Sequence, residues 1–527
     1  MENWQKVTRL YGVLVVATVT LVGKQCLSED TVKIPYPTLS KQTTVLTEPI
    51  DEEGFVDYLT ALNNRTAEGV TPENNFEIVF REVMGDRNLE EIAEEYYRLL
   101  GVAPSNDSEN RFLPLDDYLL EKYPGDSSKS DRSKFREVLY KLQSKPWSET
   151  EHPLCAEWLK RNERALLRIS DGAKRSQNFC PLVVPDSEKS SEANLISVRL
   201  PSQLERREIV SALRLRSANR LNSGNDGGSL EDLRTIQRIA SLTSQTEHPI
   251  EWLSAVGFHA TARTGEIVFL NHAKIRPERL REIANEIDRQ EDFPSPLHTV
   301  DRYSRYMFLE AMTKVYCQPE TLKEIAQGAK VVPPASRQLL KPQVLDKQLR
   351  WGNRQFDEML EICEIQDSLK RREASEKFSE AFEDSLQKRK ENLLLEFLTV
   401  SKAEMWGITG RDIVYALTAP ALQIVDSHQR RITRKRMASL AFLIEAYHLE
   451  RGEYPEELAK LIPDYIGDLP ADEHSGKPFH YERKNNGCIL ISFGPNQRDE
   501  SSSLTPKDSD VNSTGDDLVI ELGTTPQ

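Results

Sequence analysis

A glycine-rich loop, Gly224-Asn225-Asp226-Gly227-Gly228-Ser229, has residue types that could in principle hold a phosphate. The backbone N–H groups of such a loop can bind an anion at the start of a helix. The lysine of a Walker motif is missing, however, and Glu231 and Asp232 add negative charge to the first turn of the next helix. That negative charge interacts favourably with the helix dipole but repels a bound anion. We therefore interpret the loop as a turn in which Ser229 caps the next helix.

The cysteines and histidines form no recognisable metal or redox motif. The six cysteines contain no CxxC pair, and the nine histidines contain no HExxH sequence. In an oxidising compartment Cys155 and Cys180 are candidates for a disulfide, and the alternative is that the thiols are free and buried. The sequence therefore predicts no cofactor from these residues.

Composition bounds the class of protein. The length of 527 residues is enough for two to four domains. Hydrophobic residues at 38% and charged residues at 29% are typical of a folded chain. The formal net charge of -15 would repel phosphate backbones. We therefore expect no nucleic-acid partner.

The N-terminus contains a targeting segment. Lys6 and Arg9 precede an uncharged apolar stretch over residues 10–23, and Lys24 follows it. Fourteen helical residues span about 21 Å, less than a hydrocarbon core of about 30 Å. No small-x-small cleavage site follows, so we expect an uncleaved membrane anchor; a cleaved signal peptide and a buried helix are the alternatives. The positive-inside rule then places the bulk of the chain outside the cytoplasm.

Helical periodicity dominates the middle of the chain. We divide the sequence into a signal or anchor segment (1–30), a spacer (31–50), a helical domain (51–185), a second helical domain with long helices (201–405) and a helix with a small sheet (406–527). Asp51 and Thr71-Pro72-Glu73 are predicted to start the first two helices. Further helical periods cover residues 89–100, 131–143 and 154–169. A helix to about Asn222, the glycine-rich turn and another helix from Leu230 are predicted to form a helical hairpin. The predicted fold class is mainly α, either helical hairpins or an irregular bundle.

Two apolar features of the second half belong to this helical region. Phe378, Phe382, Leu386, Leu393 and Phe397 form a helix stripe, which is either core or a groove for a partner helix. The apolar run over residues 413–425 spans 13 residues and contains Pro420, so we expect a buried, kinked helix rather than a second membrane crossing.

The last hundred residues predict a small α+β unit. An amphipathic helix over about residues 430–449 begins with a basic cluster, which we define as Arg430, Arg431, Arg434, Lys435 and Arg436. The cluster is either a solvated helix end or a contact for anionic lipid or an acidic partner. Gly452 suits the helix C-cap. Alternating residues on both sides of Asn485-Asn486-Gly487 predict a β-hairpin, and residues 518–521 a third strand.

These residues carry a resemblance to a known family. The run through Arg451-Gly452-Glu453-Tyr454-Pro455, then Leu469-Pro470, Ser475-Gly476-Lys477-Pro478 and Ser492-Phe493-Gly494-Pro495-Asn496, resembles the globular head of the major pseudopilins of type II secretion systems. It covers roughly 90–100 residues, under a fifth of the chain. The whole chain looks similar to large bacterial membrane-anchored proteins that carry this head, and those supply no activity to carry over.

The resemblance also implies a cofactor. In that family the loop after the last hairpin strand often binds calcium, and the residues in matching positions here are Asp499, Asp516 and Asp517. This chain departs from the family in a Ser/Thr/Asp-rich insertion over about residues 501–513, so a solvated acidic loop is the alternative. It also lacks the Gly-Phe-Thr-Leu-x-Glu signature before residues 10–23, and filament assembly through that segment is not expected.

Together these features predict a membrane-anchored, extracytoplasmic interaction or scaffold protein of the bacterial envelope, associated with a type II secretion or pilus-like system through envelope or secretion proteins. We find no catalytic motif and expect no enzyme. The alternative is an envelope hydrolase with paired carboxylates in the helical region, because one sequence does not reveal which carboxylates lie close together.

Overall fold

The computed structural model describes residues 36–105, 109–125, 129–185, 194–317, 342–380, 410–411, 413–499 and 517–523. Several predicted features lie outside these residues: the apolar segment 10–23, one of the six cysteines (Cys26), the stripe residues Phe382 to Phe397, and Asp516. Within the described residues the chain is mainly helical, with one three-stranded antiparallel sheet, as the predicted fold class requires.

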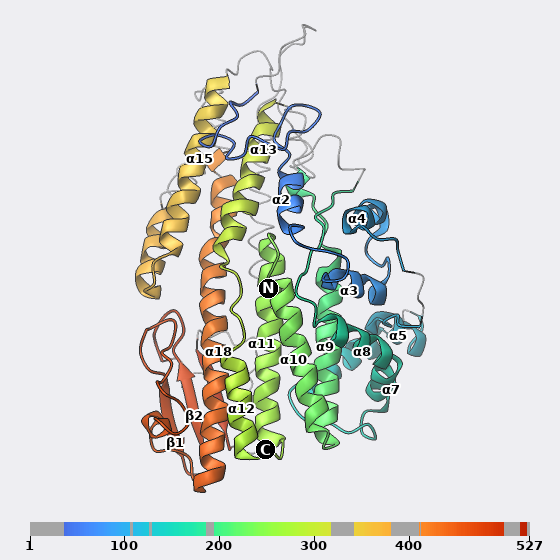
Figure 1. Cartoon of the computed structure of the whole chain (residues 1–527), viewed down its shortest axis with the longest axis vertical. Helices are drawn as coiled ribbons and strands as arrows, with labels where there is room; N and C mark the ends of the chain where they lie inside the picture. The colour runs from blue at the N-terminus through green and yellow to red at the C-terminus, as the bar shows by residue number, and fades with distance from the viewer. Residues whose placement is uncertain are drawn as a thin grey trace.

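The first block consists of short helices packed on one side of the molecule (Figure 1). Two of its predicted starts are wrong. α2 (Tyr58–Thr66) is capped by Asp57, whose carboxylate accepts from Thr60 N at 2.9 Å, while Asp51 instead closes a turn by accepting from Phe55 N. α3 (Phe76–Met84) is capped by Asn75. The others are η1 (Glu90–Ile92), α4 (Ala93–Leu100), α5 (Leu115–Lys122), α6 (Lys129–Leu142), α7 (Pro153–Arg161) and α8 (Glu163–Gly172).

We call the described residues before Pro420 the body. Three long helices form its centre. α9 (Pro201–Asn222) and α10 (Asp226–Thr243) make the predicted antiparallel hairpin, and α11 (Pro249–His272) packs against both. α10 begins four residues before the predicted start at Leu230. Its cap is Asn225, which accepts from Gly228 N at 3.0 Å. Ser229 is therefore not the cap; it lies inside α10 and hydrogen-bonds to Ser217 on α9.

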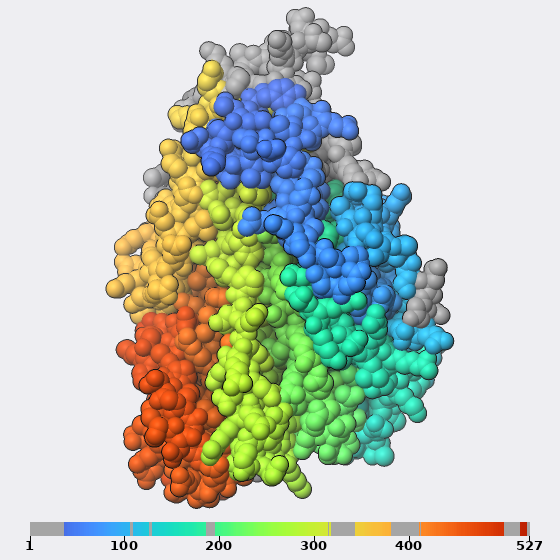
Figure 2. Space-filling model, in the orientation of Figure 1, coloured from blue at the N-terminus to red at the C-terminus, as the bar shows by residue number. Residues whose placement is uncertain are grey.

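The second half of the body continues along the long axis of the molecule. It contains η4 (Asn194–Ile196), α12 (Pro277–Asp288), η5 (Thr299–Ser304), α13 (Arg305–Cys317) and α15 (Pro342–Cys363). Residues 36–50, predicted as a spacer, lie over this part in dark blue (Figure 2). Thr38 donates to Asp346 on α15 from both N and Oγ1, at 2.9 and 2.7 Å.

α18 (Pro420–Arg451) is the longest element and joins the body to the small sheet. One of its sides packs on α11 and α12, and the sheet lies on the other side (Figure 1). The apolar run 413–425 is split between a helix over residues 413–418 and the start of α18, with a turn at Ala419, so the kink before Pro420 is as predicted. Gly452 has a positive φ of 78° and ends α18 as predicted.

The sheet and its surroundings form the head, which we define as residues 452–499 and 517–523. Strands β1 (His480–Lys484), β2 (Gly487–Ser492) and β3 (Leu518–Leu522) pair in the order β1-β2-β3, and η8 (Leu458–Leu461) precedes them. The hairpin is therefore confirmed, but β2 is buried at every position rather than at alternate ones. As the central strand it is covered on both faces.

One hydrophobic core runs from Phe55 in the first block to Leu522 in β3. The head shares this core instead of standing apart from it, because α18 contributes residues such as Leu440 and Ile444 to it. None of the helices in the described ranges combines the length and the apolar character that a membrane crossing needs.

Candidate functional site

The basic cluster lies in the middle of α18, not at a solvated helix end. α18 starts ten residues before Arg430, at Pro420, so a full turn and more of helix precedes the cluster. Arg431 is only 1% exposed, and Arg430, Arg434, Lys435 and Arg436 are half-buried. The prediction of a solvated end is therefore wrong, because the predicted helix was too short at its N-terminal side.

One side of the cluster is bound to the loop after α12. Arg431 Nη2 lies 3.1 Å from Asp292 Oδ1, and its guanidinium stacks 4.4 Å from the ring centroid of Phe293. Lys435 Nζ donates to the carbonyl of Gln290 at 2.5 Å and lies 3.4 Å from the same Asp292 carboxylate. One exposed carboxylate thus serves two cations, which fixes α18 against the body.

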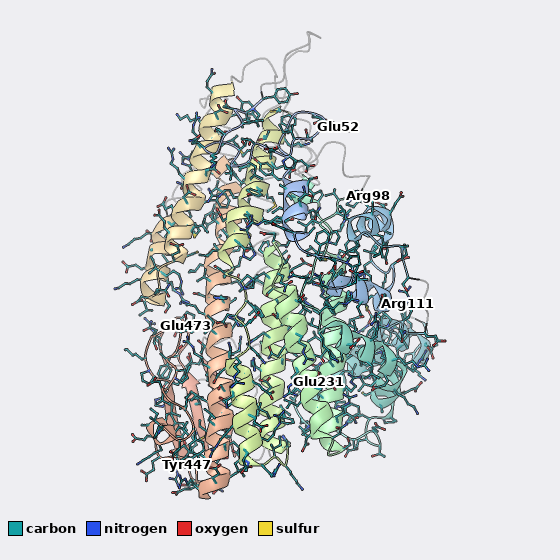
Figure 3. All side chains as sticks on the ribbon, viewed as in Figure 1. Glu52, Arg98, Arg111, Glu231, Tyr447 and Glu473 are labelled. Atoms are coloured by element: carbon teal, nitrogen blue, oxygen red, sulfur yellow. The ribbon has the colours of Figure 1, made fainter. Side chains whose placement is uncertain are left out.

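The opposite side of the cluster is bound to the head. Arg436 Nη1 donates to the carbonyl of Ala471 at 2.7 Å and lies 2.7 Å from Glu473, which Figure 3 labels where the head meets α18. Close by, Arg371 on the helix over residues 368–380 is 1% exposed and lies 2.9 Å from Asp426 on α18. The head, α18 and this helix therefore meet at one charged junction.

Arg434 lies between these two sides and differs from its neighbours. It is half-buried, yet it makes no hydrogen bond or ion pair with any residue the structure describes. Burial, and then the positive charge of Arg430 one turn earlier, lowers the pKa of Arg434 to about 10. A guanidinium in this position is partly desolvated without compensation, which is an unfavourable state that a nearby anion would relieve.

Two buried histidines flank Arg434. His474 in the head is 2% exposed, and neither of its ring nitrogens has a hydrogen-bond partner in the described part of the chain. Burial, and then Arg430, Arg371 and Arg434, lowers its pKa to about 3. On α11, burial and four basic residues including Arg434 hold the pKa of His259 well below its usual value. Both rings are therefore neutral near pH 7.

The junction is rich in positive charge. The five residues of the basic cluster together with Arg371 and Arg372 supply seven cations. Among the described residues, the carboxylates that pair with them include Asp292, Asp426 and Glu473. The arrangement is suited to hold an anionic group at Arg434.

A second charged group, buried between α3 and α9, has a different character. Glu77 accepts hydrogen bonds from Arg81 Nε at 2.9 Å, Arg206 Nη2 at 2.5 Å and Tyr96 Oη at 2.8 Å. Arg81 also bonds to Glu205, and all these side chains are at most 5% exposed. These carboxylates are saturated by cations and hydroxyls, as in a structural network.

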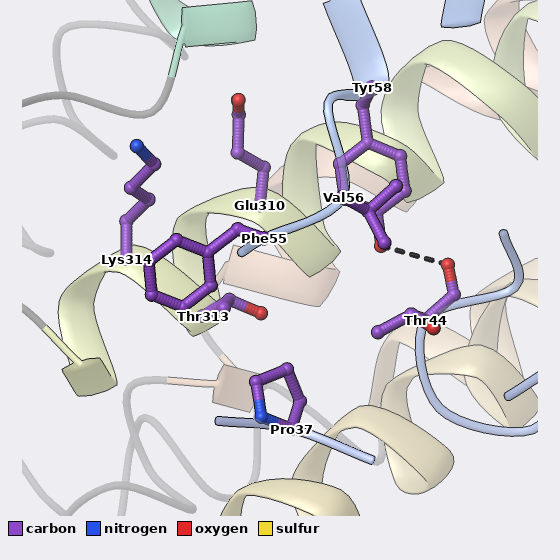
Figure 4. Close-up of a pocket in the computed structure, with 8 residues that line it drawn as sticks. All are labelled: Pro37, Thr44, Phe55, Val56, Tyr58, Glu310, Thr313 and Lys314. Atoms are coloured by element: carbon purple, nitrogen blue, oxygen red, sulfur yellow. Dashed lines mark hydrogen bonds between the residues drawn. The ribbon is translucent and has the colours of Figure 1, made fainter. Parts of the chain in front are cut away.

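The pocket in Figure 4 is too small for a substrate. It lies between the segment 37–58 and α13, and its volume of about 10 Å³ is close to the space that a single water molecule needs. Tyr58 Oη in its lining donates to the carbonyl of Thr44 at 2.8 Å.

The residues predicted for calcium are only partly described. Asp499 is exposed at the end of the turn that follows β2, Asp517 is buried directly before β3, and Asp516 lies outside the described residues. Across the described ranges no group of three or more His, Cys, Asp or Glu residues is arranged to hold a metal ion. The calcium site stays a prediction of the resemblance.

The other sequence candidates have structural roles. Gly228 N is bonded to Asn225, and residues 226–229 of the glycine-rich loop form the first turn of α10, so the predicted turn is shorter than the loop. The five described cysteines are free thiols, and Cys155 and Cys180 form no disulfide. The sequence indicates the basic cluster as a candidate site. It does not indicate its buried neighbours His259 and His474, because each is a lone histidine in its segment and matches no motif.

No protein-family model, no curated protein and no solved structure matches this chain.

Proposed function

We propose that this chain is a membrane-anchored, extracytoplasmic scaffold protein of the bacterial envelope, and that an acidic segment of a partner protein binds to it at Arg434. Residues 10–23 supply the anchor, and the resemblance of the head to pseudopilins suggests a partner in a type II secretion or pilus-like system. The observation that carries the binding part is the half-buried Arg434 guanidinium without an anionic partner in the described structure.

A protein segment suits this position better than a membrane surface. Lipid head groups attract basic side chains that project from a protein surface. Here Arg431 is 1% exposed and the side chain of Lys435 is 12% exposed, and both are already bonded to the loop after α12. A single acidic side chain needs to reach only the Arg434 guanidinium, whereas a lipid surface binds several basic side chains that project together.

The buried pair of Glu77 and Glu205 does not fit the hydrolase alternative. A glycoside hydrolase needs two carboxyl groups that face a substrate and a water molecule. Glu77 and Glu205 are each bonded to arginine and are at most 2% exposed. Their bonds hold α3 to α9.

The test uses full-length tagged protein, cross-linked in its native membranes, followed by mass spectrometry of what co-purifies. The variants are Arg434→Gln and the double variant Arg430→Gln with Arg434→Gln. The matched control is Lys141→Gln, an exposed cation paired only with Glu137. Loss of a charge-assisted hydrogen bond of about 1.5–3 kcal/mol should reduce the yield of the partner roughly 10- to 100-fold.

The control should leave that yield unchanged. Equal partner yields from the wild type, both Arg434 variants and the control would refute binding at Arg434. Binding of each variant to vesicles of anionic lipid is measured alongside. If Arg434→Gln lowers vesicle binding but leaves the partner yield unchanged, Arg434 contacts lipid instead of a protein. Deleting residues 1–30 tests the anchor separately, since the anchor requires that deletion to move the protein from the membrane fraction to the soluble fraction.

A further inference from the structure

Arg214 on α9 is a buried cation without a counter-charge. Its side chain is 2% exposed, and it makes no hydrogen bond or ion pair within the part of the chain that the structure describes. Its Nη2 atom is fully enclosed and unbonded there. Two residues further on, the buried Arg216 does have a counter-charge, because its guanidinium lies 2.6 Å from the carboxylate of Asp232.

The position of Arg214 is where α9, α10 and α11 meet. A Cβ atom added to Gly265 on α11 would lie 2.9 Å from Arg214 Nε, and Leu233 on α10 closes the same spot. Burial is the single cause that lowers the pKa of Arg214, to about 10, so no carboxylate lies close enough to raise it. Among the described residues, these three helices therefore place no negative charge beside the Arg214 guanidinium, and its Nη2 atom is fully enclosed.

Gln237 on α10 is a second buried donor without an acceptor among the described residues. It lies one helical turn after Leu233, and the unbonded atom is its Nε2. α9 and α10 run antiparallel, with Ser217 bonded to Ser229 and Arg206 to Thr243. Since side chains lean toward the N-terminus of their own helix, Arg214 and Gln237 lean toward each other.

We propose that a small inorganic anion of the chloride class binds between Arg214 and Gln237. An isolated buried charge is strongly unfavourable, whereas an anion accepts from both donors and cancels the charge. Gly265 and Leu233 pack against the Nε side of Arg214, so the proposed anion is bound at the enclosed Nη2 atom. The site lies inside the three-helix junction and is independent of binding at Arg434.

The experiment measures the melting temperature of the full chain in sodium chloride and in sodium gluconate at equal ionic strength. Gluconate is too large for the site. We expect chloride to raise the melting temperature of the wild type saturably, by about 1 °C at tenfold excess over the dissociation constant. Arg214→Met should lose this chloride dependence. Arg207→Met, at an exposed position of the same helix, should keep it.

Two outcomes would overturn the proposal. Identical melting of the wild type in chloride and gluconate would show that the carbonyl of a rotated Gln237 amide, or water, is the sole partner of Arg214. A chloride dependence that persists in Arg214→Met would place the anion elsewhere. The wild-type comparison stands by itself if Arg214→Met does not fold.

Discussion

Arg206 on α9 donates a hydrogen bond from Nη2 to Glu77 Oε2 on α3 at 2.5 Å, and both side chains are buried. The two residues are 129 positions apart and lie on opposite sides of the Pro- and Ser-rich stretch over residues 181–200. The first helical block is therefore bonded to the second through a charged contact in the interior.

Replacing Glu77 by Gln tests how much this contact stabilises the fold. Without the carboxylate, Arg206 stays buried without compensation, and we expect the free energy of unfolding to fall by about 3–5 kcal/mol. Denaturant unfolding measures the change. Glu137→Gln is the matched control, because Glu137 is exposed and pairs only with Lys141, and it should change stability by less than about 0.5 kcal/mol. Similar losses in the two variants would contradict a structural role for Glu77.

Buried histidines should make the protein less stable as the pH falls below neutral. Burial, and then nearby arginines, lowers the pKa of His474 to about 3, and burial followed by Arg431 lowers that of His428 to about 4. In the unfolded chain a histidine has a pKa of about 6.5 and takes up a proton that the native state excludes. Stability is therefore full above pH 6.5 or so and decreases down to the folded pKa.

The size of the change in the free energy of unfolding with pH gives a direct test of the protonation state of His474. Between pH 6.5 and pH 5, each such histidine should reduce the free energy of unfolding by about 2 kcal/mol. Urea unfolding at a series of pH values measures this slope. In His474→Gln the slope should be smaller by the contribution of one proton. An unchanged slope would mean that His474 is protonated in the native state.

Two glycines on α11 form a matched pair. A Cβ atom at Gly265 would collide with Leu233 and lie 2.9 Å from Arg214 Nε, so Gly265→Ala should destabilise the protein by about 1–3 kcal/mol. Gly257 is exposed and has nothing within 4 Å, so Gly257→Ala should stabilise it by roughly 0.5–1 kcal/mol. Thermal unfolding compares the two. Changes of the same sign would contradict the close packing of α9 and α10 on α11.

Local features of the fold could be predicted from the sequence. The helices near residues 89–100 and 131–143, the α9–α10 hairpin and the β1–β2 hairpin follow from periodicity and from turn residues. Helix starts were less accurate, since several Asp, Asn and Ser residues compete as caps. The caps in the structure, Asp57 and Asn75, each lie four to six residues after the predicted helix start.

The candidate site was predictable only in part. The run of basic residues from Arg430 to Arg436 was visible, but its burial depends on helices that come from distant parts of the chain. α18 extends ten residues further toward the N-terminus than its amphipathic pattern showed, because Pro420 fits the first turn of a helix. Unpaired buried arginines such as Arg214 and Arg434 cannot be told from surface arginines without knowledge of tertiary packing.

Point substitutions suit the central claim better than truncation. Removing the chain after about residue 425 would delete most of α18, which packs on α11 and α12 and contributes to the shared core. Such a protein would lose its body together with its head. A probe placed on α18 itself avoids this difficulty.

Site-specific photo-cross-linking in native membranes tests binding at Arg434 most directly. A photoreactive residue at Ser427 lies two helical turns before Arg434 on the same face of α18, and one at Leu449 lies at the exposed far end of that helix. We predict a partner adduct from position 427 that Arg434→Gln abolishes, and no such adduct from position 449. An adduct from position 427 that survives Arg434→Gln, or one that forms from position 449 alone, would contradict the account.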